Sequence, residues 1–517
     1  MKFFNKLFSV RTLVILILLI EITLFVLAAI YFNEFFAEIK SAFTFLSLFV
    51  ALFIFSSKCN SSYKIAWLLF IIVFPAFGTV CYILFANKKF TYREKKKIKP
   101  TREALKIANA SKESNNIVEK IDKVKDPDAY FIGRYLNDCA DTGIFKNTKV
   151  TYFPWGQDGW KVILEKLESA KHYIFMEYFI IEPGVMWDPM LEILSRKAKE
   201  GVDVRLLYDD FGCLSTLPSR YFLKMRELGI KCYAVNKLRP FVDIRMNNRD
   251  HRKIMVIDGH TGFTGGINLA DEYINEKERF GKWKDNAIML EGDGVFGLTS
   301  IFLSTWVLLS REHIVDFSPY LPSLYAKEVA KPRACSGYVA PYGSFPFANE
   351  TIAKNIYVDL IMKAKDYIYI TTPYLILDDE MNNALIKAAK GGVKIKLITP
   401  HIPDKETVFE LTRSFYKDLV MAGVEIYEFT PGFIHAKTFV IDGEMAIVGT
   451  INLDYRSLFL HMENGCFMYK CDCIKDIQKD LNETIDDSRL ITKEMVKSSP
   501  FSKRVLRFFL RMFASAL

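Results

Sequence analysis

Long apolar runs occupy the first 90 residues of the chain. They cover residues 12–32, 41–56 and 65–86, and the first and third are long enough to span a bilayer as helices. A cleaved signal peptide would be shorter and would end in small residues, so three successive runs favour a membrane anchor. The second run is compatible with a tilted span, a re-entrant segment or an interfacial segment. We therefore expect a transmembrane region of two or three spans over residues 1–90.

The pattern changes after residue 90. Residues 91–128 are polar and basic, are helical in composition and carry no strong apolar face, which predicts a linker. Beyond it, amphipathic helical patterns alternate with continuous apolar strands, as in an α/β domain with a largely parallel or mixed sheet covered on both faces. The chain then repeats itself: AKHYIFMEYFI at residue 170 is matched by AKDYIYITTPYLI at 364, and AKEGVDVRLLY at 198 is matched by AKGGVKIKLIT at 389.

A repeat with such even spacing implies two homologous α/β halves. We place the first half at residues 129–325 and the second at 326–498. Packed about a pseudo-twofold axis, the two halves would bring equivalent strands together.

The tail, residues 499–517, predicts a basic amphipathic helix. At 100° per residue its large apolar side chains share one face and its cations share the other, as in a helix lying on an anionic bilayer. A terminal helix docked on the preceding domain is the alternative, and the polar face alone does not decide between them. The apolar face holds Phe501, Val505, Phe508, Phe509 and Met512, and the basic face holds Lys503, Arg504, Arg507 and Arg511.

Charge and cysteine content indicate the kind of partner and the compartment of the protein. The formal net charge of +9 favours an anionic partner, either lipid headgroups or nucleic acid. The run NKKFTYREKKKIK after the third apolar run carries seven Lys or Arg, which places the following domain on the cytoplasmic side. None of the nine Cys forms a CxxC pair, as expected for free thiols in a reducing compartment.

One chemical motif, His-x-Lys-x4-Asp, occurs twice. It falls at His251, Lys253 and Asp258, and again at His435, Lys437 and Asp442. Each copy reads as a strand, an Asp-Gly turn and a returning strand. In both copies a Gly follows the His by fourteen residues and an Asn follows it by seventeen. These are Gly265 and Asn268 in the first copy, and Gly449 and Asn452 in the second.

Two His with two Lys suit phosphate chemistry. The Lys can neutralise the non-bridging oxygens of a phosphodiester while one imidazole attacks phosphorus and the other protonates the departing alkoxide. No cofactor or metal is needed for this scheme, and the Lys beside each His opposes a zinc site. Asp258 and Asp442 complete the motifs, but their place at the turn favours a structural role, in which each bonds nearby backbone.

These motifs resemble the phospholipase D superfamily, whose members bring two HKD motifs to one active site. Within it the chain looks most like the bacterial cardiolipin synthases of the Gram-positive type, through the stretches MEYFII, LYDDFG, GGIN with the following WKD, and VGTINLDYRS. The resemblance implies two α/β/α sandwich halves about a pseudo-twofold axis. It also implies further site residues.

By resemblance, a carboxylate some 25 to 35 residues beyond each His orients the imidazole, and the matching positions are Asp285 and Glu463. The same comparison assigns phosphate contacts to Asn268 and Asn452 and close backbone approach to the substrate to three glycines. Glu177 matches a further position of the first half, but the second half has Thr371 in that region and its role stays open. The glycines are Gly265, Gly266 and Gly449, and Thr450 stands where the first copy has Gly266, so that its hydroxyl replaces a backbone contact.

The resemblance implies a multi-pass enzyme of the cell membrane that condenses two phosphatidylglycerol molecules into cardiolipin and glycerol through a phosphatidyl-histidine intermediate. Its partners would be phosphatidylglycerol and anionic membrane lipid, with no nucleic acid. A membrane-bound hydrolase of the phospholipase D type is the alternative, because the same His pair can transfer the phosphoryl group to water. A nuclease is disfavoured by the membrane segments, and a lipid-binding scaffold is disfavoured because both His-Lys pairs are intact.

Overall fold

The chain folds into two compact units. The first contains Met1–Lys88 and Leu238–Met246, and the second contains Lys89–Lys237 and Asn247–Ser515. The structure is a computed structural model. It describes residues 23, 33–57, 60–85, 92–237, 248–310, 312, 314–325, 336–346, 350–512 and 514.

Three helices form the described part of the first unit: α3 (Asn33–Ser56), α4 (Ser61–Val73) and α5 (Pro75–Phe85). The apolar run 65–86, expected as one long helix, is divided between α4 and α5. Pro75 lacks an N–H to continue the ladder, and the residue before it, Phe74, leaves the helical region with φ −128° and ψ 75°. The chain then folds back, so that the rings of Trp67 and Tyr82 lie 5.3 Å apart in an edge-to-face contact.

The three apolar runs expected to form membrane spans differ in what the structure describes of them. Among the described residues, no helix is both long enough and apolar enough to cross a bilayer. The second apolar run, 41–56, lies within α3. The first, 12–32, lies outside the described residues apart from Thr23.

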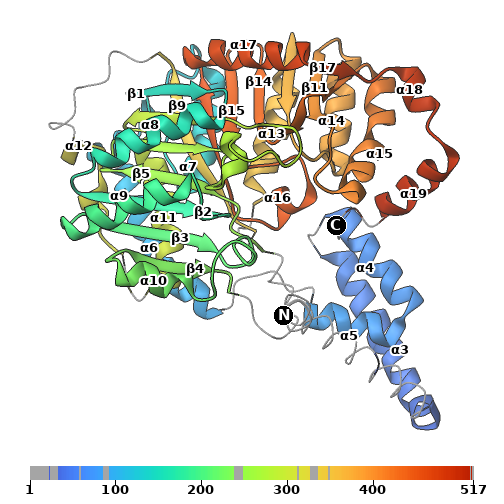
Figure 1. The fold of residues 1–517 in the computed structure, drawn as a ribbon. Coiled ribbons are helices and arrows are strands. Elements are labelled where there is room, and N and C mark those ends of the chain that lie inside the picture. Colours follow the sequence, from blue (N-terminus) through green and yellow to red (C-terminus); the bar gives the residue numbers. More distant parts are fainter. Residues whose placement is uncertain are drawn as a thin grey trace, which may run out of the picture. The chain divides into compact units, whose positions relative to one another are not determined.

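The second unit contains two large mixed sheets (Figure 1). The first has the strand order β1-β8-β6-β5-β2-β3-β4, with β2, β3 and β4 parallel and the other pairs antiparallel. Its strands are β1 (Thr148–Phe153), β2 (Tyr173–Tyr178), β3 (Asp203–Asp209), β4 (Lys231–Val235), β5 (Lys253–Ile257), β6 (Thr261–Gly265) and β8 (Ala287–Gly292). Its helices are α8 (Gly156–Glu168), α9 (Trp187–Lys199), α10 (Tyr221–Glu227) and α11 (Val295–Leu309), followed by α12 (Pro322–Tyr325).

The second sheet has the order β9-β16-β15-β14-β10-β11-β12-β17. Apart from the additional β17, this is the order of the first sheet, which confirms the two homologous α/β halves. Its strands are β9 (Tyr338–Ser344), β10 (Tyr367–Thr371), β11 (Lys394–Pro400), β12 (Glu425–Phe429), β14 (Thr438–Ile441), β15 (Met445–Gly449), β16 (Glu463–Tyr469) and β17 (Ser488–Leu490). Its helices are α13 (Ile352–Lys363), α14 (Asp379–Lys390), α15 (Glu406–Ala422), α16 (Tyr455–Phe459), α17 (Cys473–Asp486), α18 (Lys493–Lys497) and α19 (Phe501–Met512).

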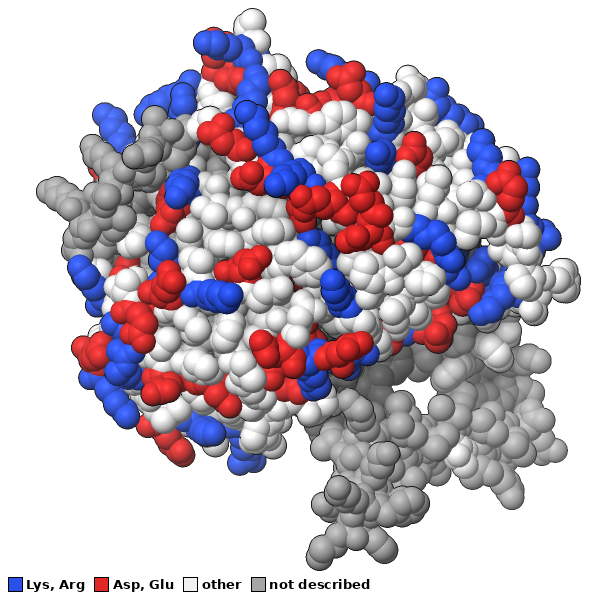
Figure 2. Space-filling model, turned by 45° about the horizontal axis from the view of Figure 1, so that its top comes forward, with Lys and Arg blue, Asp and Glu red and all other residues white. Residues whose placement is uncertain are grey.

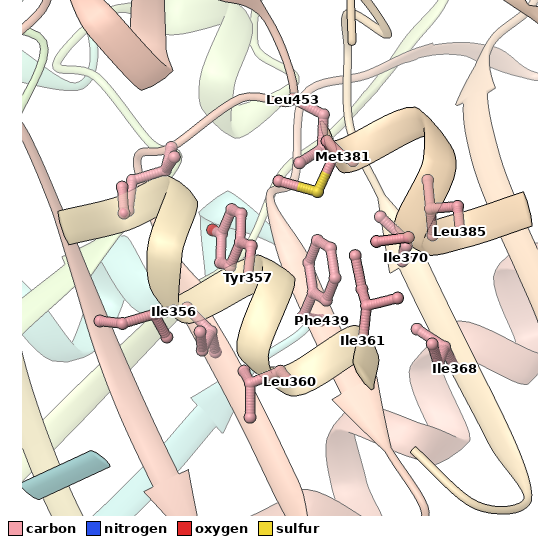
Figure 3. Packing of buried hydrophobic residues seen from close by; sticks show 14 of the residues in the cluster. Ile356, Tyr357, Leu360, Ile361, Ile368, Ile370, Met381, Leu385, Phe439 and Leu453 are labelled. Carbon is pink, nitrogen blue, oxygen red and sulfur yellow. The ribbon is translucent and has the colours of Figure 1, made fainter. Parts of the chain in front are cut away.

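Each half has an outer core, and the two halves share a central one. The outer core of the second half packs α13 and α14 on the sheet, with the ring of Tyr357 stacked on that of Phe439 at 4.4 Å (Figure 3). The central cluster unites Ile254 of β5 with Val440 of β14 and with Trp306 of α11. The halves are therefore joined by buried apolar surface, which is the dominant stabilising contribution in folding.

The segment expected to be a linker, residues 91–128, is largely helical and packed. Helix α6 (Tyr92–Ala110) lies against α11 and buries Leu105 in the central core. Lys97 Nζ donates to the carbonyl oxygens of Leu308 and Ser310, at the end of α11. The next helix, α7 (Pro127–Cys139), buries its apolar face in the outer core of the second half. In the structure these helices belong to the second unit.

Candidate active site

The two HKD motifs lie where the halves meet, and backbone pairing holds each one against the other half. The N–H of His251 donates to Met462 O at 2.9 Å, and the N–H of His435 donates to Lys284 O at 2.7 Å. Around His435 this pairing extends into a small parallel sheet of β7 (Lys282–Lys284) and β13 (Gly432–Ile434). The two donor–acceptor pairs are equivalent under the repeat, so one arrangement occurs twice.

Each imidazole is oriented by the carboxylate of the opposite half. His251 Nδ1 lies 3.0 Å from Glu463 Oε2, and His435 Nδ1 lies 2.6 Å from Asp285 Oδ2. Both carboxylates come directly after the residue that accepts the backbone bond, so one short segment holds both the backbone and the ring of each His. A ring held through Nδ1 presents Nε2 for chemistry.

Burial dominates the electrostatics of the two rings. His251 and His435 are 7% and 6% exposed, and desolvation lowers their pKa values to about 3 and about 4. Glu463 and Asp285 oppose this shift, because a carboxylate favours the charged ring. For both carboxylates burial alone would raise the pKa, but the contacts with the histidines outweigh it and lower the pKa. These pKa shifts favour neutral imidazoles and ionised carboxylates at neutral pH.

The two motif lysines are also buried. Lys253 Nζ donates to His251 O at 2.5 Å, and Lys437 Nζ donates to His435 O. Burial lowers the pKa of Lys253 to about 7, with Glu463 opposing the shift and Lys437 adding to it. Burial likewise lowers the pKa of Lys437 to about 8. The charge of Lys437 thus acts on Lys253 although the two lysines belong to different halves. A bound anion would raise the pKa of both and so favour the protonated form of both.

The motif aspartates bond to backbone. The carboxylate of Asp258 accepts from the N–H groups of Lys171, His172 and Tyr173 at 2.7–2.8 Å. Asp442 accepts from the three equivalent N–H groups, those of residues 365, 366 and 367, at 2.8–2.9 Å. Both aspartates have positive φ, 49° and 52°, and each is followed by a glycine of positive φ, as a tight hairpin turn requires. These contacts support a structural role.

Each of the three glycines makes room for a neighbouring protein segment, and the expected close approach of their backbone to the substrate stays a prediction. A Cβ on Gly265 would lie 2.3 Å from Asn286 O, and one on Gly449 would lie 2.4 Å from Asn464 O, so each permits close approach of the next strand. A Cβ on Gly266 would lie 2.0 Å from Asp285 Oδ1. Thr450, at the equivalent position, donates its hydroxyl to Glu463 Oε2 and so fixes the longer carboxylate.

The two asparagines differ. Asn268 accepts from Ile180 N at 3.0 Å and donates to the hydroxyl of Tyr273 at 2.6 Å, so most of its amide is engaged within the protein. Asn452 is buried, and its Oδ1 has no hydrogen-bond partner. The assignment of both asparagines as phosphate contacts stays a prediction, and their surroundings leave more hydrogen-bonding capacity to Asn452.

Sequence reasoning missed several residues at the site. His461 places its ring 5.7 Å from that of His251 and its Nδ1 3.5 Å from Glu463 Oε1. Arg252, fully buried beside His251, contacts Glu177 at 2.8 Å and Asp250 at 2.8 Å. Glu177 therefore belongs to an ionic cluster beneath the first motif. Arg252 lies between two motif residues and His461 lies two residues before Glu463, but nothing in their spacing distinguished them from ordinary polar residues.

Among the described residues, one group of side chains could hold a cation. His251, His461 and Glu463 bring their ligand atoms within 4.8 Å of one another. Glu463 is already engaged by His251 and Thr450, and the ammonium group of Lys253 disfavours a second positive charge. The donor set therefore suits orientation of an imidazole better than binding of a metal.

Comparison with known proteins identifies the class. The family described as "Cardiolipin synthase, PLD-like domain" matches residues 163–292 and 357–485, one match in each half. A second family, "Phospholipase_D-nuclease N-terminal", matches residues 42–87. Together with the apolar runs, this N-terminal match indicates association with a membrane. The solved structure of phosphatidylserine synthase from Haemophilus influenzae shares the fold, with a TM-score of 0.55 at 15% identity over 75% of this chain and 97% of that one.

The curated relatives agree. A cardiolipin synthase of Geobacillus kaustophilus is 32% identical over 91% of this chain and 92% of its own. A cardiolipin synthase of Alkalihalophilus pseudofirmus is 30% identical over 95% of this chain and 97% of its own. An uncharacterized protein of Streptococcus mutans is 43% identical over 90% of this chain and 99% of its own. The chain belongs to the cardiolipin synthase family of proteins with two phospholipase D-like domains.

Proposed function

We propose that the protein is a cardiolipin synthase that transfers a phosphatidyl group from one phosphatidylglycerol molecule to another and releases glycerol. The observation that carries the proposal is the crossed pair of imidazoles: His251 held by Glu463 and His435 held by Asp285, with a buried lysine beside each. This arrangement contains every group that a two-step transfer at phosphorus requires.

In the first step, Nε2 of His251 attacks phosphorus of the donor lipid and the bond to the glycerol headgroup breaks. His435 gives a proton to the departing glycerol oxygen, and a phosphatidyl-histidine forms. Lys253 and Lys437 neutralise the non-bridging oxygens, and Glu463 stabilises the positive charge that develops on the nucleophilic ring. The bound phosphodiester, being an anion, favours the protonated His435 that this step needs.

In the second step, His435 takes a proton from the free hydroxyl of another phosphatidylglycerol. That oxygen attacks phosphorus, the phosphorus–nitrogen bond breaks, and cardiolipin leaves with His251 restored. Hydrolysis differs only in the acceptor, because water would give phosphatidic acid. Since both histidines are more than nine-tenths buried, the site favours an acceptor delivered with the lipid over bulk water.

We further propose that the N-terminal apolar runs anchor the protein in the cell membrane with two or three spans and that the second unit is cytoplasmic. The support is the basic run at residues 87–99, which carries seven of the cations of the chain beside the third apolar run. On the face of the second unit that Figure 2 shows, basic and acidic side chains are interspersed. That face presents no field of one sign, which favours a lipid partner over nucleic acid.

The test uses purified protein with radiolabelled phosphatidylglycerol in mixed micelles, scored for cardiolipin, phosphatidic acid and glycerol. We expect cardiolipin and glycerol in equal amounts, with loss of turnover by at least about 10³-fold in His251→Ala and in His435→Ala. His260→Ala is the matched control, since His260 lies in the turn between β5 and β6 and its ring contacts the hydroxyl of its neighbour Thr261 at 2.8 Å. Phosphatidic acid as the main product would assign the hydrolase instead.

The order of the two histidines is tested by trapping. With His435→Ala the first step lacks its acid, but a donor with a better leaving group should still label His251. We expect label on His435→Ala and none on His251→Ala. Label on the opposite variant would exchange the two roles, and label on neither variant, with full activity of the wild type, would remove the covalent intermediate.

A further inference from the structure

The last helix of the chain is docked in an unusual orientation. Helix α19 (Phe501–Met512) lies along α15 and turns its basic face toward the protein. Lys503 and Arg507 both bind the carboxylate of Glu410, which is buried on α15, with Arg507 Nε 2.8 Å from Glu410 Oε2. One turn further, Arg511 Nη2 lies 2.9 Å from Asp418 Oδ2.

The opposite face of α19 is apolar and exposed. Phe501 is 79% exposed and Phe508 is 64% exposed. An amphipathic helix of a soluble domain normally buries its apolar face and exposes its charges. Here the arrangement is reversed, because cations are bound to the domain and the aromatic rings point outward. The exposed apolar side chains of the helix are Phe501, Val505, Leu506, Phe508, Phe509 and Met512.

We infer that this outward face of α19 inserts into the hydrocarbon boundary of a lipid bilayer. Three of its four cations are ion-paired to the domain, so attraction to anionic headgroups is not the main contribution to binding. Only Arg504 remains at the edge of the apolar face. The contact that is left for a partner is apolar, and a membrane interface accepts an apolar helix face of this size.

A second copy of the chain is a poorer occupant. Stable protein interfaces use about 20–30 residues on each side, whereas this face offers six side chains on one helix. The bilayer is also already near, since the matched N-terminal region and the lipid substrate of the proposed function both place the chain at a membrane. The inference rests on the proposed function only in this choice of occupant.

The docking of α19 changes which face of the predicted basic helix is available to a membrane. That prediction placed the cations toward an anionic bilayer. In the structure Glu410 and Asp418 take three of them, so binding should depend on the phenylalanines and only weakly on lipid charge.

The test places an environment-sensitive fluorescent residue at position 508 of the full chain, reconstituted in phosphatidylcholine vesicles whose acyl chains carry bromine as a quencher. A second variant carries the same residue at position 131, because Phe131 on α7 is similarly exposed at 59% and serves as the matched control. We expect quenching at 508 to exceed that at 131 at least about 3-fold, and to persist in about 1 M salt, where exposed charges are screened.

Absence of quenching at 508 would overturn the inference. Quenching that appears only in parallel vesicles supplemented with phosphatidylserine, and that disappears in salt, would replace the apolar contact with an electrostatic one and would also overturn the inference. A probe that is shielded only at high protein-to-lipid ratio, without quenching by bromine, would assign the face to a second copy. The vesicles contain no phosphatidylglycerol, so none of these outcomes depends on whether the protein makes cardiolipin.

Discussion

At the scale of single residues, each motif histidine depends on a carboxylate from the other half. This crossing could not be predicted from spacing, because Asp285 and Glu463 follow the histidines of their own halves in sequence. The exchange requires the closeness of two segments, and only the fold provides it. In contrast, the identities of both carboxylates followed from resemblance, and both lie within 3.0 Å of an imidazole nitrogen.

The motif lysines predict how activity depends on pH. Burial lowers the pKa of Lys253 to about 7 and of Lys437 to about 8, so raising pH removes positive charge from the free site. The imidazoles, with pKa values of about 3 and 4, stay neutral over this range. Because the first step uses protonated His435, kcat/KM in mixed micelles should fall with rising pH already above about pH 4, and it should fall more steeply above about pH 7 to 8, where the lysines lose their charge.

The opposite result is easy to recognise. If the steeper fall of kcat/KM begins only near the ordinary lysine pKa of about 10.4, then the pKa values of the lysines in the free enzyme are not shifted. Lys253→Met and Lys437→Met should each reduce kcat/KM by about 10²-fold or more at pH 6, because each removes a charge that the transition state needs.

Replacing a motif aspartate should lower the stability of the protein and leave the rate of the chemical step nearly unchanged. Asp258→Asn replaces an acceptor oxygen by an amide group that faces backbone donors, and it leaves at least one of three N–H groups unsatisfied. We expect the free energy of unfolding to fall by about 1–3 kcal/mol, measured by thermal denaturation in detergent, while the rate per folded molecule changes less than about 3-fold. Asp476→Asn, on the exposed face of α17, is the control.

A stable Asp258→Asn protein with no turnover would contradict this assignment and return the aspartate to the chemistry. The same comparison applies to Asp442, whose three partners are equivalent. Asn also adopts positive φ readily, so the substitution tests the hydrogen bonds and not the turn.

At the scale of elements, the alternation of helices and strands and the repeat could be predicted from the sequence, because buried strands and amphipathic helices have different periods. Two features could not be predicted: the packing of residues 92–110 on the domain and the division of the run 65–86. Residues 92–110 lack a strong apolar face, yet α6 packs on α11 through Leu105 and through Lys97, which caps the end of that helix. The run 65–86 is uniformly apolar, and its division depends on one proline.

A side chain at Gly266, directly after β6, should displace a group of the site by steric contact. Gly266 gives room to the carboxylate of Asp285, which in turn orients His435. In Gly266→Ala the new Cβ would lie 2.0 Å from Asp285 Oδ1, so the carboxylate must move. We expect kcat to fall by about 10²-fold, the scale of a misplacement of about 1 Å, with little change in KM.

Gly159→Ala is the matched control, because a Cβ on this glycine of α8 would meet its nearest atom at an ordinary 3.6 Å. Its kcat should stay within about 2-fold of wild type. A Gly266→Ala protein as active as this control would show that Asp285 does not need its observed position.

At the scale of the whole molecule, the two halves form one folding and catalytic body. The central core contains side chains of both sheets, and two asparagine–threonine bonds cross between the halves: Asn286 Nδ2 to Thr438 Oγ1 and Asn464 Nδ2 to Thr264 Oγ1, each 2.7 Å. Each asparagine directly follows the carboxylate that orients the opposite imidazole. The same two segments therefore hold the halves together and complete the site.

This arrangement predicts that covalent continuity between the halves is dispensable once the chain has folded. A protease site inserted between Tyr325 and Ser336 would separate the first half from the second when cleaved. Because buried apolar surface and the crossed hydrogen bonds join the halves, we expect the two fragments to elute together in size-exclusion chromatography in detergent and to retain at least about half of the activity. After separation in denaturant, neither fragment alone should transfer phosphatidyl groups, since each imidazole then lacks its carboxylate. Fragments that part under native conditions, or a single fragment with turnover, would contradict a site that both halves build.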